Sequence, residues 1–475
     1  MARADTGTLR VETHSIDRIP DEERHGSPRG LFAVWFGANL QLTTVVTGAL
    51  APSLGLSIPW ALLAIILGNL FGAVFMALHS AQGPRLGIPQ MIQSRAQFGF
   101  YGAILPLLLV ILMYVGFFAS SGILAGEALA EPSSLSPDLS IAIVAVVCVI
   151  ITIFGYRLIH LLERTSSVLS AIAFCFVTVL ILSSSKLGGV WHAGPFHGGK
   201  FLLMVAIAAT WQISYAPYVA DYSRYLPART SIASCFWWTY AGSVVASVSM
   251  MAFGALAVAI APKALDQGLT AHLVGLAPAA VRWPLALAFV LGVIAVNVLN
   301  LYGAFMSFTT TATAIKPFAV GSGTRIVTVV VVGVVGTALA IAGRLSFVTS
   351  YTDFILFLTY FLIPWTSINL VDFYFIRRES YDISAIFQPD GRYGAIAWRA
   401  VVPYLLGMAV EIPFTSTSFY TGPMVSHLGG ADISWILGLI VSAGAYYLMM
   451  KPSLATESIT MAGGSVLEDD SSRLR

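Results

Sequence analysis

The feature that most constrains this fold is a succession of long apolar runs separated by short polar stretches. A helix needs about 20 predominantly apolar residues to cross the hydrocarbon core of a bilayer. The chain of 475 residues is 57% hydrophobic and 10% charged, with a mean hydropathy of +0.82. Soluble domains carry about 25% charged residues, so this composition predicts an all-α integral membrane protein.

Twelve runs are long enough, or nearly long enough, to be transmembrane helices. They are Leu31–Leu54, Pro59–Leu78, Gly102–Leu124, Ile141–Gly155, Leu158–Leu182, Phe201–Ala220, Ser231–Ile260, Trp283–Thr310, Ile326–Ala342, Tyr351–Phe375, Ile396–Pro413 and Ile433–Met450. We expect Pro364 to break the tenth run, and the semi-apolar loop Gly83–Gly99 to form a short interfacial helix. Glu411 is expected at the outer interface.

The distribution of Lys and Arg sets the expected orientation, because cytoplasmic loops carry an excess of both. With the N-terminus inside, thirteen fall on inner loops and span ends and five on outer loops. We therefore expect residues 1–30 and 453–475 to be cytoplasmic tails of a multi-pass protein in the plasma (inner) membrane. The first thirty residues lack the apolar region of a cleaved signal peptide, so the first helix should direct insertion.

Several classes of function find little support in the sequence. The net charge of +2 implies no nucleic-acid partner. The cysteines Cys148, Cys175 and Cys235 lie in apolar runs, and we interpret them as core residues rather than metal ligands. No cofactor is implied. A His-Glu-x-x-His motif and paired intramembrane carboxylates, which a membrane-embedded enzyme would need, are absent from the sequence, as is a filter-like repeat of a channel.

The sixth run, within Phe201–Pro227, does not remain a simple apolar helix. Trp211, Gln212 and Ser214 enter it, and Pro217 follows. Proline removes a backbone donor and clashes with the preceding turn, and freed backbone groups survive in a membrane only where protein or a wet cavity covers them. This pattern predicts either a discontinuous helix, such as transporters place at their binding sites, or an ordinary proline kink.

The first run is also interrupted, by Gly37, Asn39, Gln41 and Gly48. Paired interrupted segments in corresponding positions of two repeats are a pointer to a transporter site. On this pattern alone we expect a membrane domain over 31–452. It would comprise a first repeat at 31–184, an inverted second repeat at 201–375 and two C-terminal helices at 396–450.

Two further helices carry polar groups in pairs on one face. Phe117 and Ser121 are four residues apart, and Asn297 and Asn300 are three apart. An asparagine amide both donates and accepts hydrogen bonds, so this pair suits the edge of a flat heterocycle. Packing at a helix crossing, or a hydrogen bond between helices, is the alternative in each case.

Five motifs occur in an order that resembles the nucleobase–cation symporter family, in its purine and cytosine permease branch. They are Val34-Trp-Phe-Gly-Ala-Asn39, Gly87-x-Pro89 with Arg95-x-x-Phe-Gly99, Tyr215-Ala-Pro-Tyr-Val-Ala-Asp-Tyr-Ser-Arg-Tyr225, Asn300-Leu-Tyr302, and Ile363-Pro364 with Asp372-Phe-Tyr and Arg377-Arg378. The resemblance implies a leucine-transporter-like fold of five plus five inverted spans with two extra helices, 12 in all.

The resemblance also implies the substrate-binding residues, position by position. They are Gly37, Phe117, Ser121, Trp211, Gln212, Tyr215, Asn297 and Asn300. Ser121 replaces an asparagine of the fungal relatives, and Gln212 stands where several relatives have a stacking aromatic. These two departures leave the identity of the cargo open.

Coupling to a cation is a further implication of the resemblance. Sodium-coupled relatives place hydroxyl side chains where this chain has Ile294 and Ala295, which favours proton over sodium. Asp353 is the candidate proton carrier, with a charge at the outer rim as the alternative.

The expected function is therefore import of a nucleobase-like planar heterocycle, cytosine or a purine, by cation symport through alternating access. The partners would be this small molecule, H⁺ or Na⁺, and the lipid bilayer. Sodium-coupled transport of allantoin, a hydantoin or a thiamine or pyrimidine precursor is the alternative, and an embedded enzyme or a channel is the other class.

Overall fold

The computed structural model describes residues 17–154, 156–316, 318 and 321–451, without the side chains of 156–161, 163 and 164. Most of the expected N-terminal tail, all of the expected C-terminal tail and Gly155 lie outside the described residues. Within these ranges the chain is helical, and its only extended pairing is an isolated bridge between Ser416 and Thr421.

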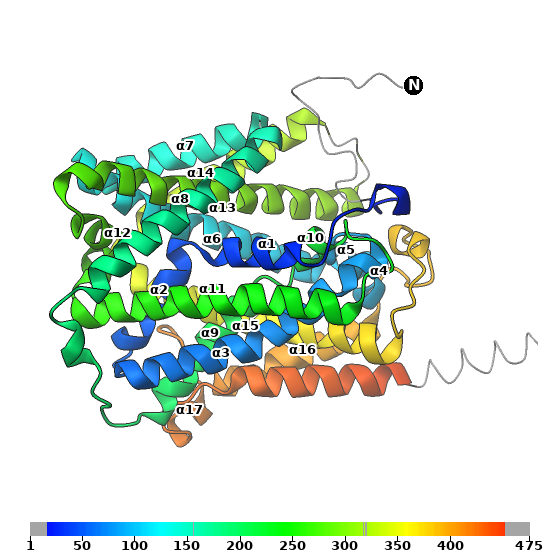
Figure 1. The fold of residues 1–475 in the computed structure, drawn as a ribbon. Helices are drawn as coiled ribbons and strands as arrows, with labels where there is room; N and C mark the ends of the chain where they lie inside the picture. The colour runs from blue at the N-terminus through cyan, green and yellow to red at the C-terminus, as the bar shows by residue number, and fades with distance from the viewer. Residues whose placement is uncertain (1–16, 155, 317, 319–320, 452–475) are drawn as a thin grey trace, which may run out of the picture.

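Helices α1 to α8 make up the first part of the bundle (Figure 1). Their bounds are α1 Gly30–Asn39, α2 Leu42–Ser53, α3 Ile58–Ser80, α4 Gln82–Leu86, α5 Gln90–Phe98, α6 Ile104–Ser133, α7 Pro137–Phe154 and α8 Tyr156–Leu182.

The remaining helices run to the end of the described chain. Their bounds are α9 Gly198–Ile213, α10 Val219–Ser223, α11 Ile232–Ile260, α12 Ala264–Gly275, α13 Ala279–Ile315, α14 Ser322–Gly343, α15 Phe347–Val371, α16 Trp398–Glu411 and α17 Pro423–His427, followed by a final helix at Ser434–Lys451.

The helices have the length and apolar composition that a bilayer requires. Among the described residues, eight helical segments qualify as spans, and α1 with α2 forms a further, bent candidate. One of the eight, Ser322–Ile376, contains both α14 and α15. The prediction of an all-α membrane protein is confirmed. The count of twelve crossings stays a prediction, because α9 and α16 have only 16 and 14 residues.

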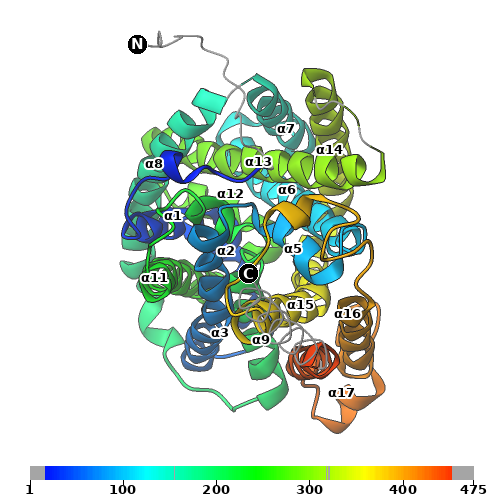
Figure 2. The ribbon, with the colours of Figure 1, turned by 90° about the vertical axis from the view of Figure 1, so that its right-hand side faces the viewer.

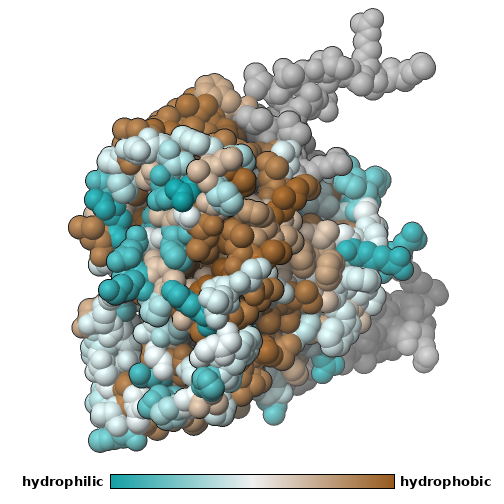
Figure 3. Space-filling model, turned by 60° about the vertical axis from the view of Figure 1, so that its left-hand side comes forward, coloured by the Kyte–Doolittle hydropathy of each residue, from teal (hydrophilic) through white to brown (hydrophobic). Residues whose placement is uncertain are grey.

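The surface agrees with this assignment. Figure 3 shows a band of hydrophobic side chains between hydrophilic regions at the two ends of the molecule. One end carries the start of the described chain, and we call it the N-terminal end; the final helix also ends there (Figure 1). The other is the opposite end.

The helices pack in pairs that fix the position of both interrupted segments. α3 packs along α9, α11 along α1 and α2, and α6 along α13; Figure 2 shows α11 nearly end-on, whereas α13 runs across the view. At the α3–α9 contact a Cβ on Gly72 would overlap the backbone of Ala209, so only glycine permits this approach.

Three expectations from the sequence are wrong. Pro364 does not break α15, which is helical from Phe347 to Val371; neighbouring helices can cover the backbone groups that a proline frees in a membrane. The loop Gly83–Gly99 is occupied by two helices, α4 and α5, rather than one, and every residue of α5 is buried. Cys175 is exposed and not a core residue. Glu411 is buried where the end of α16 meets the first turns of the final helix, and its place at the outer interface stays a prediction.

Candidate substrate site at two helix breaks

Both interrupted runs are broken helices. α1 ends at Asn39 and α2 begins at Leu42, and the two are bent by 59°. Gln41 between them is extended, with φ −143° and ψ 158°. α9 ends at Ile213 and α10 begins at Val219, so the break contains Pro217. The discontinuous reading of the Phe201–Pro227 stretch is therefore the correct one.

Asn39 joins the two breaks through its side-chain amide. Its Oδ1 accepts hydrogen bonds from Trp211 Nε1 at 2.8 Å and from Tyr215 Oη at 3.3 Å. Its Nδ2 donates to the carbonyl oxygen of Trp35 at 2.8 Å and to Ser243 Oγ of α11 at 3.1 Å. One fully buried side chain thus holds the end of α1 against α9, the turn after it and α11.

Gln41 makes the second connection. Its Nε2 donates to the Ala38 carbonyl at 2.7 Å and to Tyr215 Oη at 3.1 Å, and its Oε1 accepts from Thr43 Oγ1 at 2.9 Å. The extended residue of the first break is thereby fixed to an aromatic residue of the second.

A cluster of aromatic rings surrounds the breaks. Trp211 lies edge-on to Phe117 of α6 and to Tyr215, with ring centroids 5.9 and 5.8 Å apart. Phe117 in turn contacts Phe354 of α15 at 5.1 Å. The cluster continues through the following pairs: Trp35 with Tyr215, Tyr215 with Tyr218, and Tyr218 with Tyr114.

The two amides of α13 reach the same level of the bundle. Asn297 Nδ2 donates to the carbonyl oxygen of Phe118 at 3.1 Å, and Asn300 Nδ2 donates to Asn297 Oδ1 at 3.1 Å. Three residues further, Gly303 packs on the ring of Tyr114. Asn300 lies between these two contacts along α13. It is therefore beside the turn of α6 that contains Phe117.

Asn300 keeps one polar atom available. Its Oδ1 has no hydrogen-bond partner among the described residues, and the residue is 8% exposed, against 1% for Asn297. Asn297 orients Asn300, and Asn300 presents a free acceptor next to the aromatic cluster.

The structure thus brings together five of the eight predicted substrate residues: Phe117, Trp211, Tyr215, Asn297 and Asn300. Ser121 lies one turn of α6 beyond Phe117, buried, with no partner for its Oγ among the described residues. Gly37 faces α8, because a Cβ on it would lie 3.5 Å from Ser167 Oγ.

Gln212 does not join this group. Its Nε2 donates to Asn69 Oδ1 of α3 at 2.8 Å and to Ser247 Oγ of α11 at 2.6 Å, while its Oε1 accepts from Ser243 Oγ at 2.6 Å. Its amide is occupied by the helices behind α9, so direct contact with a substrate would require these bonds to break.

Gln212→Leu therefore separates packing from binding. The change removes the donor to Asn69 Oδ1 and the acceptor for Ser243 Oγ, at about 1–3 kcal/mol for each buried group left unpaired, while both serine hydroxyls keep another hydrogen bond. We expect the free energy of unfolding to fall by about 3 kcal/mol, with the ligand affinity of the folded protein nearly unchanged. Thermal unfolding measures the stability, and equilibrium binding measures the ligand affinity. A variant with normal stability and lost affinity would show that Gln212 contacts the substrate.

Asp353, the candidate proton carrier, lies toward the opposite end of α15. Its Oδ1 accepts from Ser418 N at 2.9 Å, and its Oδ2 accepts from Ser418 Oγ. It lines a cavity of about 660 Å³ between the ends of α2, α9, α11 and α15 and the loop containing Ser418. The carboxyl holds this loop and does not contact the amides of α13.

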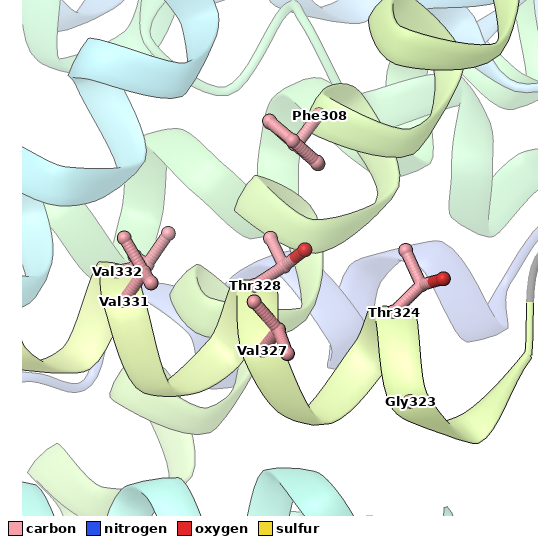
Figure 4. A pocket seen from close by; sticks show the side chains of 7 residues that line it. All are labelled: Phe308, Gly323, Thr324, Val327, Thr328, Val331 and Val332. Atoms are coloured by element: carbon pink, nitrogen blue, oxygen red, sulfur yellow. The ribbon is translucent and has the colours of Figure 1, made fainter.

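A second cavity, of about 440 Å³, is apolar and remote from the breaks. Figure 4 shows Phe308 of α13 beside a row of α14 side chains, among them Thr324, Thr328 and Val332. It offers none of the amides that a planar heterocycle needs.

Sequence reasoning treated Asn39 and Gln41 as interruptions and did not select them as site residues. The signal was present in the Val34–Asn39 motif and in the cost of an amide in lipid. It missed Phe354 altogether, since an aromatic residue at mid-helix carries no distinguishing pattern.

Comparison with known proteins identifies the family. A family model described as "Permease for cytosine/purines, uracil, thiamine, allantoin" matches residues 18–438. The chain belongs to this permease family. It is a permease and not an enzyme, in agreement with the sequence analysis.

Two curated relatives resemble the permease over most of its length. The putative purine-cytosine permease YxlA of Bacillus subtilis is 46% identical over 446 residues, which cover 94% of this chain and 97% of that one. The purine-cytosine permease fcyB of Emericella nidulans is 26% identical, over 94% of this chain and 89% of that one.

Solved structures of Mhp1 share the fold. The inward-facing conformation aligns with a TM-score of 0.74 at 20% identity, covering 95% of this chain and 96% of that one. Mhp1, described as a nucleobase-cation-symport-1 family transporter, aligns in a closed conformation with bromovinylhydantoin bound, with a TM-score of 0.73 at 20% identity, over 94% of this chain and 96% of that one. The leucine-transporter-like fold expected from the sequence is confirmed.

Proposed function

We propose that the permease is a secondary active transporter that imports a nucleobase-like planar heterocycle, with cytosine and purines as the first candidates. The observation that carries the proposal is the meeting of two broken helices with an aromatic cluster and the amide of Asn300. The relatives named purine-cytosine permeases support this choice of cargo.

The chemistry of the site suits a flat ring with donors and acceptors on its edge. The rings of Phe117, Trp211 and Tyr215 supply faces and edges for aromatic contact, and aromatic pairs favour offset-stacked or edge-to-face arrangements. Asn300 Oδ1 accepts a hydrogen bond from a ring-edge N–H. Ser121 Oγ, one turn away, supplies a hydroxyl as donor or acceptor.

Selectivity would follow from the cost of unpaired groups. A buried hydrogen bond contributes about 0.5–1.5 kcal/mol net, whereas a buried polar group left without a partner costs about 1–3 kcal/mol. An analogue without the ring-edge N–H leaves Asn300 Oδ1 buried and unpaired. Its binding is therefore weakened by more than the net free energy of one hydrogen bond.

Alternating access requires contacts on both sides of the site to separate in turn. Toward the N-terminal end, Asp221 Oδ1 of α10 accepts a hydrogen bond from Gln90 N of α5 at 2.7 Å. Toward the opposite end, Thr47 of α2 and Tyr351 of α15 are linked through their hydroxyls at 2.8 Å. These are the contacts that movement of the broken helices would open.

The placement in the membrane also remains a proposal. We infer a plasma (inner) membrane protein with the N-terminal end in the cytoplasm, because Arg85, Arg95 and Arg224 gather near that end, as the positive-inside rule requires. The division into repeats at 31–184 and 201–375, with two extra helices at 396–450, is proposed on the same footing, supported by the broken helices near the start of each repeat.

Proton coupling is the favoured cation mode. The side chains of Ile294 and Ala295 on α13 are buried and carry no oxygen, whereas a sodium ion requires several oxygen ligands.

Proteoliposomes test the coupling directly. With an inward proton gradient and no sodium, we expect accumulation of radiolabelled cytosine or hypoxanthine above the external concentration, abolished by a protonophore. A sodium gradient alone is expected to give only equilibration. Accumulation driven by sodium and indifferent to the protonophore would contradict proton coupling and favour the alternative.

That alternative is sodium-coupled transport of allantoin, a hydantoin or a thiamine precursor. It is supported by the family description, which includes thiamine and allantoin, and by the hydantoin bound to Mhp1. A thermal-shift panel of purified permease with cytosine, hypoxanthine, allantoin and a benzylated hydantoin, with and without sodium, separates the two. Stabilisation by a nucleobase independent of sodium supports the main proposal.

A further inference from the structure

A row of buried polar side chains lies outside the substrate site, between α16 and the final helix. We call it the C-terminal seam, and it consists of Tyr404 and Glu411 of α16 with Trp435 and Ser442 of the final helix. Figure 2 shows these two helices beside α15. Each of the four residues is buried, at 9% exposed or less.

These residues lack hydrogen-bond partners to an unusual degree. Both carboxyl oxygens of Glu411, Tyr404 Oη, Trp435 Nε1 and Ser442 Oγ find no partner among the described residues. Buried polar side-chain atoms are ordinarily bonded to protein or ordered water. Five such atoms lie on this seam, and two of them belong to the carboxyl group of Glu411.

The two helices are shaped to hold these groups close together. Tyr404, Gly407 and Glu411 share a face of α16, by their spacing of three and four residues. A Cβ on Gly438 would overlap Glu411 Oε1, and one on Gly407 would overlap Ser442 Oγ. The carboxyl and the hydroxyl each rest on a glycine of the facing helix.

Each end of the seam is closed by a carboxylate that is fully bonded. Asp432 accepts from Tyr360 Oη of α15 and from Ser416 N, both at 2.9 Å, and from Ser434 N at 3.0 Å. At the N-terminal end, Asp372 accepts from Tyr446 Oη at 2.7 Å, from Tyr381 Oη at 2.7 Å and from Arg377 Nε at 3.1 Å. Glu411, between them, is the carboxyl without donors.

An ionised Glu411 would be unstable in this place. A buried charge without a partner is so costly that the group binds a proton instead. The titratable groups that face it are Tyr404 on its own helix and Asp432 ahead of the final helix, with Tyr360 of α15 bonded to Asp432. The negative charge of Asp432 adds to the penalty.

We propose that Glu411 is the proton-binding carboxyl of this permease, neutral in the present conformation, and that it exchanges its proton through the C-terminal seam during transport. The role of Glu411 in transport rests on the proposed function, whereas the presence of a proton on its carboxyl group does not.

α15 connects the seam to the substrate site. At one level its Phe354 contacts Phe117 of the aromatic cluster. Further along, Tyr360 bonds to Asp432, and Pro364 packs near Gly407 of α16. A substrate that displaces Phe117 and Phe354 shifts α15 against the seam and changes the access of water to Glu411, so that proton exchange and substrate movement are linked.

Glu411→Gln tests the coupling in proteoliposomes, because glutamine keeps the shape of the neutral acid. We expect exchange of labelled for unlabelled substrate to persist within about twofold of the unchanged chain, whereas accumulation driven by a proton gradient falls at least tenfold. Glu131→Gln is the matched control, since this glutamate of α6 is 33% exposed beside Arg282; it should keep both activities. Proton-driven accumulation that survives in Glu411→Gln, or is lost in Asp353→Asn instead, overturns the coupling role.

A second measurement needs no substrate. Infrared difference spectra of the full chain in lipid should show the carbonyl band of a protonated carboxylic acid at neutral pH, missing in Glu411→Gln and retained in Glu131→Gln. A spectrum unchanged by Glu411→Gln overturns the bound proton. If no nucleobase is transported by the unchanged chain, the proposed function fails while this spectrum still decides whether Glu411 carries a proton.

Discussion

Asn300→Ala is expected to raise the substrate concentration at half-maximal uptake about 5- to 150-fold, the equivalent of about 1–3 kcal/mol. Its Oδ1 is the one amide acceptor of the α13 pair that the protein leaves open, beside Phe117. Alanine leaves the ring-edge donor of the substrate buried without a partner. Uptake of labelled cytosine or hypoxanthine, measured at equal amounts of purified protein in proteoliposomes, gives the change.

The control for this variant lies on the same helix. Leu299→Ala removes a partly buried side chain one residue away, on another face of α13. It should change the stability of the protein without changing the half-maximal concentration. If Asn300→Ala leaves uptake unaltered, or if Leu299→Ala weakens it equally, the site does not lie where the two breaks meet α13.

Asn39→Ala has the second large effect, and it acts on the fold as well as on binding. The change removes the acceptor for Trp211 Nε1 and Tyr215 Oη and the donor to Trp35 O and Ser243 Oγ. With about 1–3 kcal/mol for each buried group left unpaired and partial rescue by water, we expect the free energy of unfolding to drop by about 3 kcal/mol or more.

Binding should fall together with stability in this variant, because Asn39 orients Trp211 and Tyr215. Thermal unfolding with and without ligand measures both quantities on one sample. Asn69→Ala is the comparison, since Asn69 bonds to Gln212 behind α9; it should lose stability alone. An Asn39→Ala protein of normal stability and normal affinity would show that the two breaks do not depend on this residue.

The fold and the breaks could be predicted from the sequence because the membrane restricts the alternatives. Amides such as Asn39 and Gln41 are too costly in lipid to be incidental, and Pro217 cannot continue a helix without cost. Spacing also placed Asn297 and Asn300 on one face, and the structure links them by a hydrogen bond.

The direction in which individual side chains point could not be predicted in the same way. Trp211 and Gln212 are adjacent in the sequence, so they point about 100° apart on a helix, and the sequence did not say which one faces the aromatic cluster. A local sequence pattern predicts that Pro364 breaks its helix. It cannot predict that α16 packs against Pro364 at Gly407. Glu411 precedes a proline near the end of an apolar run, and only the packing of the final helix shows that it is buried.

The central claim is that a planar ring binds where the two broken helices meet α13, and a cryo-EM map of the permease saturated with its best ligand tests it most directly. We predict ring density against Phe117 and Trp211, with an edge nitrogen within hydrogen-bonding distance of Asn300 Oδ1. Ring density in the apolar cavity between α13 and α14, or only in the cavity near Asp353, would contradict the account.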